Sequence, residues 1–319
     1  MFFAFYLTRN GSPISNSRLP TKDVKVGHLQ EQAALSVGTA IRRKYIVEGL
    51  LGRSNSGATY LVRDQRAGDV AGNHFVLKEV IEGNKHARHR LVSVGKVLRR
   101  LHHPALPRLR HVHNDDKKTR VYYLWDYIAG QDLETLRQQQ PEHLFSLTEI
   151  MHIMAPIIAA LTYLHHQQPP ILHGDIKPAN IMPGEGSEVV LVDFGMVNAC
   201  DPGSSTTADR YCYKAPELYN GRIDIRADIY ALGATCYTLV TGKLPLDAHT
   251  RLTQVGNDVI DPLEPVNSIV PAVPTQIGKA IERALSLDAQ YRFSSVEQFW
   301  EALWLVPADH PAPLSGRHL

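Results

Sequence analysis

Apolar and polar positions change their spacing once along this chain, near Ala129-Gly130. Before that point, short apolar runs are separated by polar turns that contain Gly and Asp, a pattern typical of an antiparallel sheet. We predict strands at residues 45–51, 57–63 and 74–80 and one helix at 85–101. The first part of the chain is therefore expected to form a small β-rich unit.

Beyond Ala129-Gly130, apolar residues recur at helical spacing. Residues 147–165 carry such a stripe, and further helices are predicted at 223–241, 275–285 and 294–305. The pattern as a whole predicts an α+β fold of two lobes. The small antiparallel β lobe with one helix covers residues 42–128, and the larger, mainly helical lobe covers 129–307.

The two ends of the chain have a different composition. Residues 1–41 are predicted to be a flexible leader or to include a misassigned start, and residues 308–319 form a short Pro-rich tail. The opening apolar run of seven residues is too short to cross a bilayer, which needs about 20. No other uninterrupted apolar stretch reaches the length needed to span a bilayer, so we expect no membrane segment and a cytoplasmic protein.

Composition excludes few functions on its own. A hydrophobic share of 44% and a net charge of +2 are ordinary globular values, so nucleic acid is not expected as a partner. The stretch between Glu82 and Asp115 is nevertheless free of acidic residues and holds eight Lys or Arg and six His. It is either a solvated helix face or a basic surface for an acidic peptide or nucleic acid. Three cysteines without metal-ligand spacing fit a reducing compartment.

Two short polar motifs stand close together in the helix-rich part. Residues 173–180 read HGDIKPAN, and Asp193-Phe194-Gly195 follows thirteen residues later. Phosphoryl transfer requires charge to be positioned and neutralised rather than covalent catalysis. Asp175 would orient or accept the proton of an attacking hydroxyl, and Lys177 would neutralise charge on the phosphate. Asn180 and Asp193 would hold a metal ion, for which their hard oxygen donors favour Mg²⁺, with Mn²⁺ as a further candidate.

Further motifs accompany these two in a fixed order. They are a Gly-rich segment at 51–60, the run Phe75-Val76-Leu77-Lys78, Ala215-Pro216-Glu217, the apolar stretch 228–233, and Arg292. With these motifs, residues of about 42–307 resemble a eukaryotic-like (Hanks-type) protein kinase of the Ser/Thr kind widespread in bacteria. The resemblance implies the two-lobed protein kinase fold, with Arg292 paired to Glu217.

The resemblance also implies a site for ATP between the lobes. The positions that match its ATP-binding residues are Leu51, Gly52, Gly57, Thr59, Val76, Lys78, Asp126, Ile128, Asp132 and Met182. Residues 126–128 would be the hinge that meets adenine. Four side chains would stack between the lobes, namely Leu98, Leu109, His173 and Phe194, and Trp125 would narrow the rear of the pocket.

Four positions depart from the family's pattern. Ser54 replaces the middle glycine of the Gly-rich segment, where a Cβ limits approach to phosphate. Val94 stands where the family places the glutamate that pairs with Lys78, so this lysine is expected to be less fixed. Gly174 replaces an arginine that pairs with a phosphorylated activation loop. Arg210 replaces a threonine that contacts the catalytic loop, and an arginine there could pair with its aspartate.

Three functions remain open from the sequence. The first is an active, slow Ser/Thr protein kinase that acts on unidentified proteins and phosphorylates itself; Lys177, two residues after Asp175, favours Ser/Thr acceptors. The second is a pseudokinase that binds nucleotide or partners through the same fold. The third, a phosphotransferase acting on small molecules, fits less well with the long segment that ends at Ala215-Pro216-Glu217.

Overall fold

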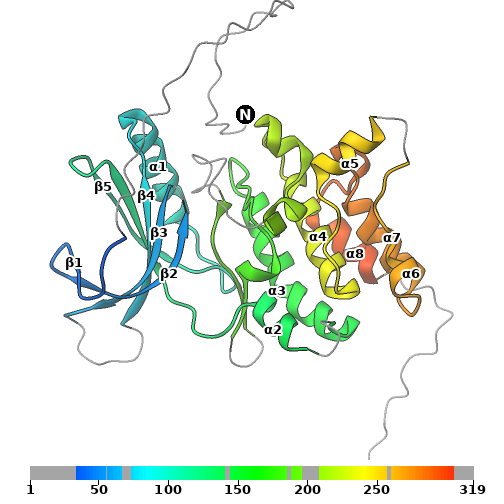
Figure 1. Cartoon of the computed structure of the whole chain (residues 1–319), viewed down its shortest axis with the longest axis horizontal. Coiled ribbons are helices and arrows are strands. Elements are labelled where there is room, and N and C mark those ends of the chain that lie inside the picture. The colour runs from blue at the N-terminus through cyan, green and yellow to red at the C-terminus, as the bar shows by residue number, and fades with distance from the viewer. Residues whose placement is uncertain are drawn as a thin grey trace, which may run out of the picture.

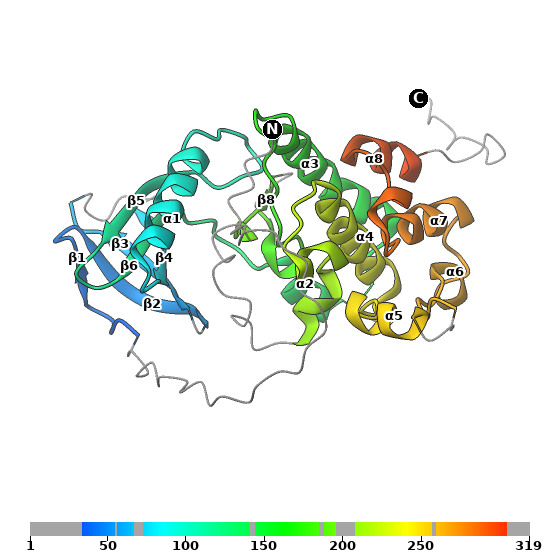
Figure 2. The ribbon, with the colours of Figure 1, turned by 90° about the horizontal axis from the view of Figure 1, so that it is seen from above.

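The computed structural model describes residues 34–54, 56–66, 73–140, 144–184, 188–195, 208–256 and 260–304. A sheet with one helix lies beside a mainly helical lobe (Figure 1), and the view from above shows the same division (Figure 2). This arrangement confirms the predicted two-lobed α+β fold. Most of the leader and the Pro-rich tail lie outside the described residues.

The small lobe is built on a six-stranded antiparallel sheet with the order β1-β2-β3-β4-β6-β5. Its elements are β1 (Ala40–Ile41), β2 (Tyr45–Ser54), β3 (Gly57–Asp64), β4 (His74–Ile81), α1 (Lys85–Leu98), β5 (Leu109–Asp115) and β6 (Arg120–Asp126). The three predicted strands are confirmed as β2, β3 and β4. The helix ends at Leu98 rather than residue 101, because its last turn tightens through a bond from the Leu101 N–H to the Leu98 oxygen, at 3.1 Å.

Residues 34–41 add to this sheet at its edge and on its outer face. Strand β1 pairs with β2, and the Leu35 N–H donates to the Tyr60 hydroxyl at 3.0 Å. Ala34, Leu35 and Ile41 pack against an apolar cluster formed by the outward-facing residues of the sheet. Burial of this apolar surface gives the segment a fixed position, so the packed lobe begins before residue 42.

The large lobe surrounds one buried helix. Its elements are α2 (Leu133–Gln139), α3 (Leu147–His165), η2 (Pro178–Asn180), β7 (Ile181–Pro183), β8 (Val189–Leu191), η4 (Ala208–Tyr213), η5 (Pro216–Asn220), α4 (Arg226–Thr241), α5 (Ala248–Val255), α6 (Val266–Ile269), α7 (Thr275–Ala284), η6 (Ala289–Tyr291) and α8 (Val296–Trp304). Every residue of α4 after the first is buried, as expected for a helix that is packed on all sides. It begins at Arg226 instead of 223 because the Asp224 carboxylate accepts the Arg226 N–H at 2.8 Å.

Helix α3 matches its predicted bounds, and its start is set by a capping box between Ser146 and Glu149. Among the described residues, it alone is long and apolar enough to cross a membrane by length and composition. Its apolar stripe, which includes Ile157 and Leu161, is buried in the large-lobe core. The helix therefore serves as a core helix of this fold, with its C-terminal end next to the predicted catalytic loop.

Candidate active site

The loop between α3 and β7 is anchored by one buried carboxylate, that of Asp228 in α4. Its two oxygens accept the backbone N–H groups of His173 at 2.9 Å and Gly174 at 2.8 Å. The His165 Nε2 atom also lies 2.9 Å from this carboxylate. Since Asp228 is fully buried, these donors supply the partners that a buried charge requires. The loop backbone is thereby fixed to the centre of the large lobe.

Three predicted catalytic residues meet on this loop. The Asn180 amide donates to the backbone oxygen of Asp175 at 2.7 Å and to its carboxylate at 3.1 Å. The Lys177 ammonium donates to the same carboxylate at 3.2 Å. Asp175 and Asn180 are both buried. A carboxylate, an ammonium and an amide are thus held in one hydrogen-bonded group.

The second motif reaches across to the small lobe. The Lys78 ammonium of β4 donates to the Asp193 carboxylate. Burial raises the pKa of Asp193, but the nearby ammonium of Lys78 outweighs it and holds the pKa below its usual range. Asp193 also adopts a left-handed backbone with φ of 62°, which is costly for a residue with a side chain and is common at functional sites.

The two motifs touch each other through their glycines. The Gly195 N–H donates to the His173 oxygen at 2.9 Å, and a Cβ at residue 195 would lie 2.5 Å from the Gly174 oxygen. Gly174 itself has φ of +78°, where a side chain would be strained. The local backbone therefore favours glycine at position 174, where the family usually has an arginine.

The predicted stack between the lobes is present. Leu98, Leu109, His173 and Phe194 are all at most 2% exposed, and the rings of His173 and Phe194 lie 4.7 Å apart. Trp125 stacks on the other side of Phe194, with ring centroids 5.7 Å apart and planes 11° from parallel. Burial lowers the pKa of His173 despite the opposing charges of Asp228 and Asp175. The tryptophan therefore helps to hold Phe194 in place.

The predicted phosphate-binding hairpin lies beside Lys78. Gly52 pairs with Thr59, which pairs in turn with Lys78, so the three residues form one row across the sheet. Leu51 is half exposed next to this row. A Cβ at Gly57 would lie 1.9 Å from the Glu79 oxygen, so this glycine is required for the packing of β3 on β4.

Ser54, the first departure, is involved in the turn of this hairpin. Its hydroxyl lies 3.4 Å from the Gly57 oxygen and 3.4 Å from the Ser56 hydroxyl. It pairs with Gly57 across the hairpin. The Ser54 side chain therefore makes its contacts within the turn of the hairpin.

The remaining predicted ATP-binding residues surround the connection between the lobes. Val76 pairs with Trp125, next to Asp126 at the end of β6. Ile128 follows, and it is partly buried, as is Met182 on β7. The Asp126 carboxylate receives two bonds from Arg110, at 2.5 and 2.9 Å.

Asp132, predicted to reach the ribose, caps the start of α2. Its carboxylate accepts the Thr135 N–H at 2.9 Å and the Thr135 hydroxyl at 3.0 Å. This cap accounts for the start of the helix. A ribose contact would have to share the carboxylate with the cap.

Asn180 and Asp193 have a donor set that fits Mg²⁺. The side-chain nitrogen of Asn180 donates to Asp175, which leaves the side-chain oxygen for a metal. The backbone oxygen of Asn180 accepts the Val192 N–H at 2.8 Å and so fixes the residue to the second motif. Carboxylate and amide oxygens are hard ligands that suit Mg²⁺ completed by nucleotide phosphates. Within the described ranges, no group of three or more His, Cys, Asp or Glu could hold a metal by itself.

The other departures differ in how far the structure describes them. Val94 is partly buried and packs against the main core, so an apolar contact replaces the expected acid. The side chain of Arg210 and the Ser/Thr run 204–207 lie outside the described part. The implied pair of Arg292 and Glu217 is confirmed, with two bonds at 2.6 and 2.9 Å.

Sequence reasoning missed the role of Asp228 and His165. In the sequence, Asp228 only opens the apolar stretch 228–233, and His165 belongs to none of the motifs described above. Their contact joins α3 to α4 over 63 residues of sequence. A single acidic residue opening an otherwise apolar helix was the available signal, because a buried carboxylate needs several donors.

Comparison with known proteins gives one family. The protein kinase domain model matches residues 45–305. A probable serine/threonine-protein kinase of Clostridium acetobutylicum is 25% identical over 84% of this chain and 40% of its own. The serine/threonine-protein kinase OXI1 of Arabidopsis thaliana is 39% identical over 66% of this chain and 50% of its own.

Solved structures show the same fold. The PknI kinase domain of Mycobacterium tuberculosis, crystallised as a double mutant, aligns with a TM-score of 0.65 at 26% identity, covering 85% of this chain and 98% of that one. The chain spans half or less of the clostridial and plant relatives.

Proposed function

Because the chain belongs to the protein kinase family, we propose that it transfers the γ-phosphate of ATP to Ser or Thr hydroxyls of proteins. The observation that carries this proposal is the contact of Lys78 with Asp193 beside the bonded group of Asp175, Lys177 and Asn180. These charges are the ones phosphoryl transfer requires. The similar proteins are named as Ser/Thr kinases, which supports the acceptor class.

In the proposed reaction, the acceptor oxygen bonds to the γ-phosphorus as the bond from that phosphorus to the ADP oxygen breaks. The hydroxyl proton passes to the Asp175 carboxylate, and the Lys177 ammonium, 3.2 Å from that carboxylate, stabilises charge on the transferred group. Mg²⁺ or Mn²⁺, held by Asn180 and Asp193, would neutralise phosphate charge when bound. The protein substrates remain to be identified, and self-phosphorylation is included in the proposal.

A second candidate is a pseudokinase that binds nucleotide or partners without transfer. The observation that favours it is Val94, whose side chain packs into the core where the family has the partner of Lys78. Lys78 then depends on Asp193 across the cleft. Misplacement of a catalytic group by about 1 Å can cost on the order of a hundredfold in rate.

A phosphate incorporation assay with ATP and Mg²⁺ or Mn²⁺ tests the first function. Asp175→Ala and Asp193→Ala should each lower incorporation by on the order of 10³-fold, because each removes a charge that acts in transfer. Glu301→Ala removes an exposed carboxylate of α8 and should leave incorporation within about twofold. Equal incorporation by the wild type and both active-site variants would overturn the proposal.

Thermal shift with ATP separates the candidates further. A ligand that binds only the folded state raises Tm as its concentration rises. A kinase shows both a shift and incorporation. A shift without incorporation supports the nucleotide-responsive pseudokinase. The absence of both a shift and incorporation supports a scaffold that binds partners only.

A further inference from the structure

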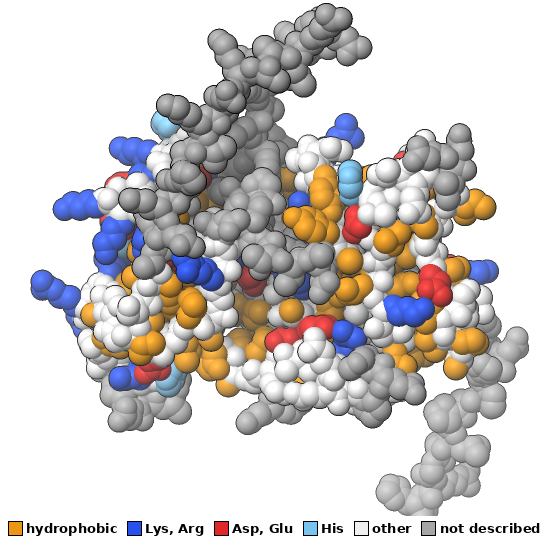
Figure 3. All heavy atoms as spheres, viewed as in Figure 1, with side chains coloured by type: hydrophobic (Ala, Val, Ile, Leu, Met, Phe, Trp, Pro, Cys, Tyr) orange, Lys and Arg blue, Asp and Glu red, His pale blue; other side chains and the backbone are white. Residues whose placement is uncertain are grey.

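The basic stretch of the small lobe is not uniformly exposed. Arg88 is buried, and its guanidinium donates to the Glu82 oxygen at 2.7 Å and to Asp116 at 2.9 Å. Its charge therefore serves the packing of α1. Lys and Arg side chains are exposed on the surface of the small lobe, on the left of Figure 3.

A cavity of about 330 Å³ opens on the outer face of the sheet. Its apolar floor is formed by Leu77 and Leu124 with the rings of Tyr45 and Tyr122. Successive side chains in a strand point to opposite faces, so Leu77 faces this cavity while Lys78 faces the candidate active site. The two sites are separated by the thickness of the sheet.

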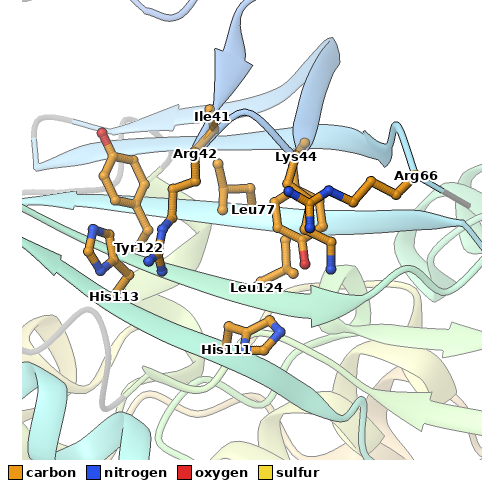
Figure 4. Close-up of a pocket in the computed structure, with 10 residues that line it drawn as sticks. Ile41, Arg42, Lys44, Arg66, Leu77, His111, His113, Tyr122 and Leu124 are labelled. Carbon is orange, nitrogen blue, oxygen red and sulfur yellow. The ribbon is translucent and has the colours of Figure 1, made fainter.

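Five basic residues line the same cavity: Arg42, Lys44, Arg66, His111 and His113. Figure 4 shows Arg42 on the side of His113 and Tyr122, and Arg66 on the side of Lys44. None of the lining residues is acidic.

Of the Lys and Arg side chains in this set, Lys44 has a carboxylate partner in the described part of the chain. Lys44 lies 3.0 Å from Asp64. Among the residues that the structure describes, no carboxylate lies within ion-pair distance of the Arg42 or Arg66 guanidinium. Two fork-shaped donors are therefore available at the rim.

The basic residues around the cavity are close enough to affect one another. Burial lowers the pKa of His111, and the nearby charges of Lys44, Arg99, Arg42 and Arg110 lower it further. A bound anion would relieve this repulsion. The apolar floor also lowers the local dielectric constant, which strengthens the attraction between these basic side chains and an anion.

The backbone that presents Arg42 is strained. Arg42 and Arg43 have φ of 52° and 55° in the turn between β1 and β2, closed by the Lys44 N–H to the Ile41 oxygen at 3.1 Å. A turn with two positive φ values normally carries Asn-Gly. Arginines that break local turn preferences are expected where a function requires their charge.

From this combination, we propose that the outer face of the small lobe binds a phosphomonoester carried on a small apolar or aromatic group. Arg42 and Arg66 would bind the phosphate from opposite ends of the cavity. A phosphomonoester carries close to two negative charges and suits guanidinium donors. The apolar group would lie on Leu77 and Leu124. The volume is at the lower end for small-molecule pockets and exceeds what a bare phosphate needs.

Titration of the full chain with phenyl phosphate tests this site. Calorimetry should show binding that Arg42→Ala and Arg66→Ala each weaken at least tenfold. Arg43→Ala is the matched control, since it removes the same charge from the same turn with the same positive φ but does not line the cavity. It should leave the dissociation constant within twofold.

Binding must also be independent of the active site. A Lys78→Met variant should bind phenyl phosphate as the wild type does. If Lys78→Met abolishes binding, or if Arg42→Ala and Arg66→Ala both leave it unchanged, the proposal is overturned. Circular dichroism of each variant excludes unfolding, and Arg42→Gln provides a second test of the same position.

Two comparison ligands define the chemistry. Inorganic phosphate and benzyl alcohol should each bind at least tenfold more weakly than phenyl phosphate, and equal binding of either would overturn the proposed ligand class. A phosphoserine peptide and its unphosphorylated form distinguish the source. Tighter binding of the phosphopeptide than of phenyl phosphate assigns the site to phosphorylated proteins, and weaker binding assigns it to free organic phosphates.

Discussion

The catalytic loop and the lysine strand contribute to one active site, but they are held in different ways. The loop residues are fixed by hydrogen bonds within the large lobe. His173 and Gly174 donate to Asp228, and Asn180 donates to Asp175. Lys78 instead has its carboxylate partner in the other lobe. The large-lobe charges are therefore set by folding, whereas the small-lobe charge depends on how the two lobes meet.

This difference makes the position of Asp193 important for Lys78. Trp125 packs on Phe194, and Phe194 stands next to the aspartate that contacts Lys78. An aromatic contact thus supports the position of Asp193, and Asp193 in turn positions the lysine. The four predictions below test the two regions separately.

Removal of the loop anchor should have the largest effect. Asp228→Ala leaves buried N–H donors at His173 and Gly174 without an acceptor, which should cost about 3 kcal/mol of stability or more. Thermal unfolding should show a Tm lower by roughly 5–10 °C, and phosphate incorporation should be lost. Thr235→Ala is the control, because this buried α4 side chain bonds only to its own helix, at the Ala231 oxygen. A Tm equal to the control's would contradict the anchoring role.

Loss of the aromatic support should have the next largest effect. Trp125→Leu removes the ring that stacks on Phe194, and aromatic pairs contribute about 0.5–1.5 kcal/mol beyond their buried area. We expect incorporation to fall about tenfold, since 1.4 kcal/mol of barrier is a factor of ten. Trp300→Leu disturbs another aromatic pair, with Trp304 in α8, and should affect stability without this loss of rate. Equal rates in both variants would show that the stack does not position Asp193.

A new acid on α1 should give a smaller effect in the opposite direction. Val94→Glu is expected to raise the rate several-fold by pairing with Lys78 before nucleotide binds. Val94→Gln has the same size without the charge and should give no gain. Steady-state incorporation at several ATP concentrations measures both. No gain in the glutamate variant would mean that Asp193 already fixes the lysine.

The smallest effect concerns pH. Burial lowers the pKa of His173 below its ordinary 6.5. Between the two pKa values, the unfolded chain therefore binds a proton at this residue and the folded chain does not. Stability from this residue is complete above about pH 6.5 and declines as pH falls toward the folded pKa. His173→Phe keeps an aromatic ring beside Phe194, and it should reduce the fall in Tm between pH 7.5 and 5.5. An unchanged fall would assign the pH dependence to other groups.

Much of this molecule could be predicted before its structure. Periodicity located β2, β3, β4 and α3, because alternation and helical stripes follow from burial of one face. It did not locate α2, α5 or α6, which are short and depend on contacts with other elements. The two motifs indicated Asp175, Lys177, Asn180 and Asp193, since their spacing along the chain already places them on two short loops.

Some site residues could not be predicted in detail. Asp126 and Asp132 match ATP-binding positions in the sequence. The structure shows that their carboxylates also bond to Arg110 and to the start of α2. Gly57 matched a phosphate-binding glycine, but the structure shows that contact with Glu79 also requires it. These constraints arise between strands and helices, where sequence spacing gives no distance.

Local pattern and residue type were enough to predict the two lobes and the chemical groups available for phosphoryl transfer. How those groups are held depends on the folded molecule: the loop is held by Asp228, Lys78 by Asp193, and Phe194 by Trp125. Folding also places five basic residues around an apolar hollow on the opposite face of the sheet. Such contacts join residues far apart in the chain, and packing and electrostatics fix them only when the whole chain has folded.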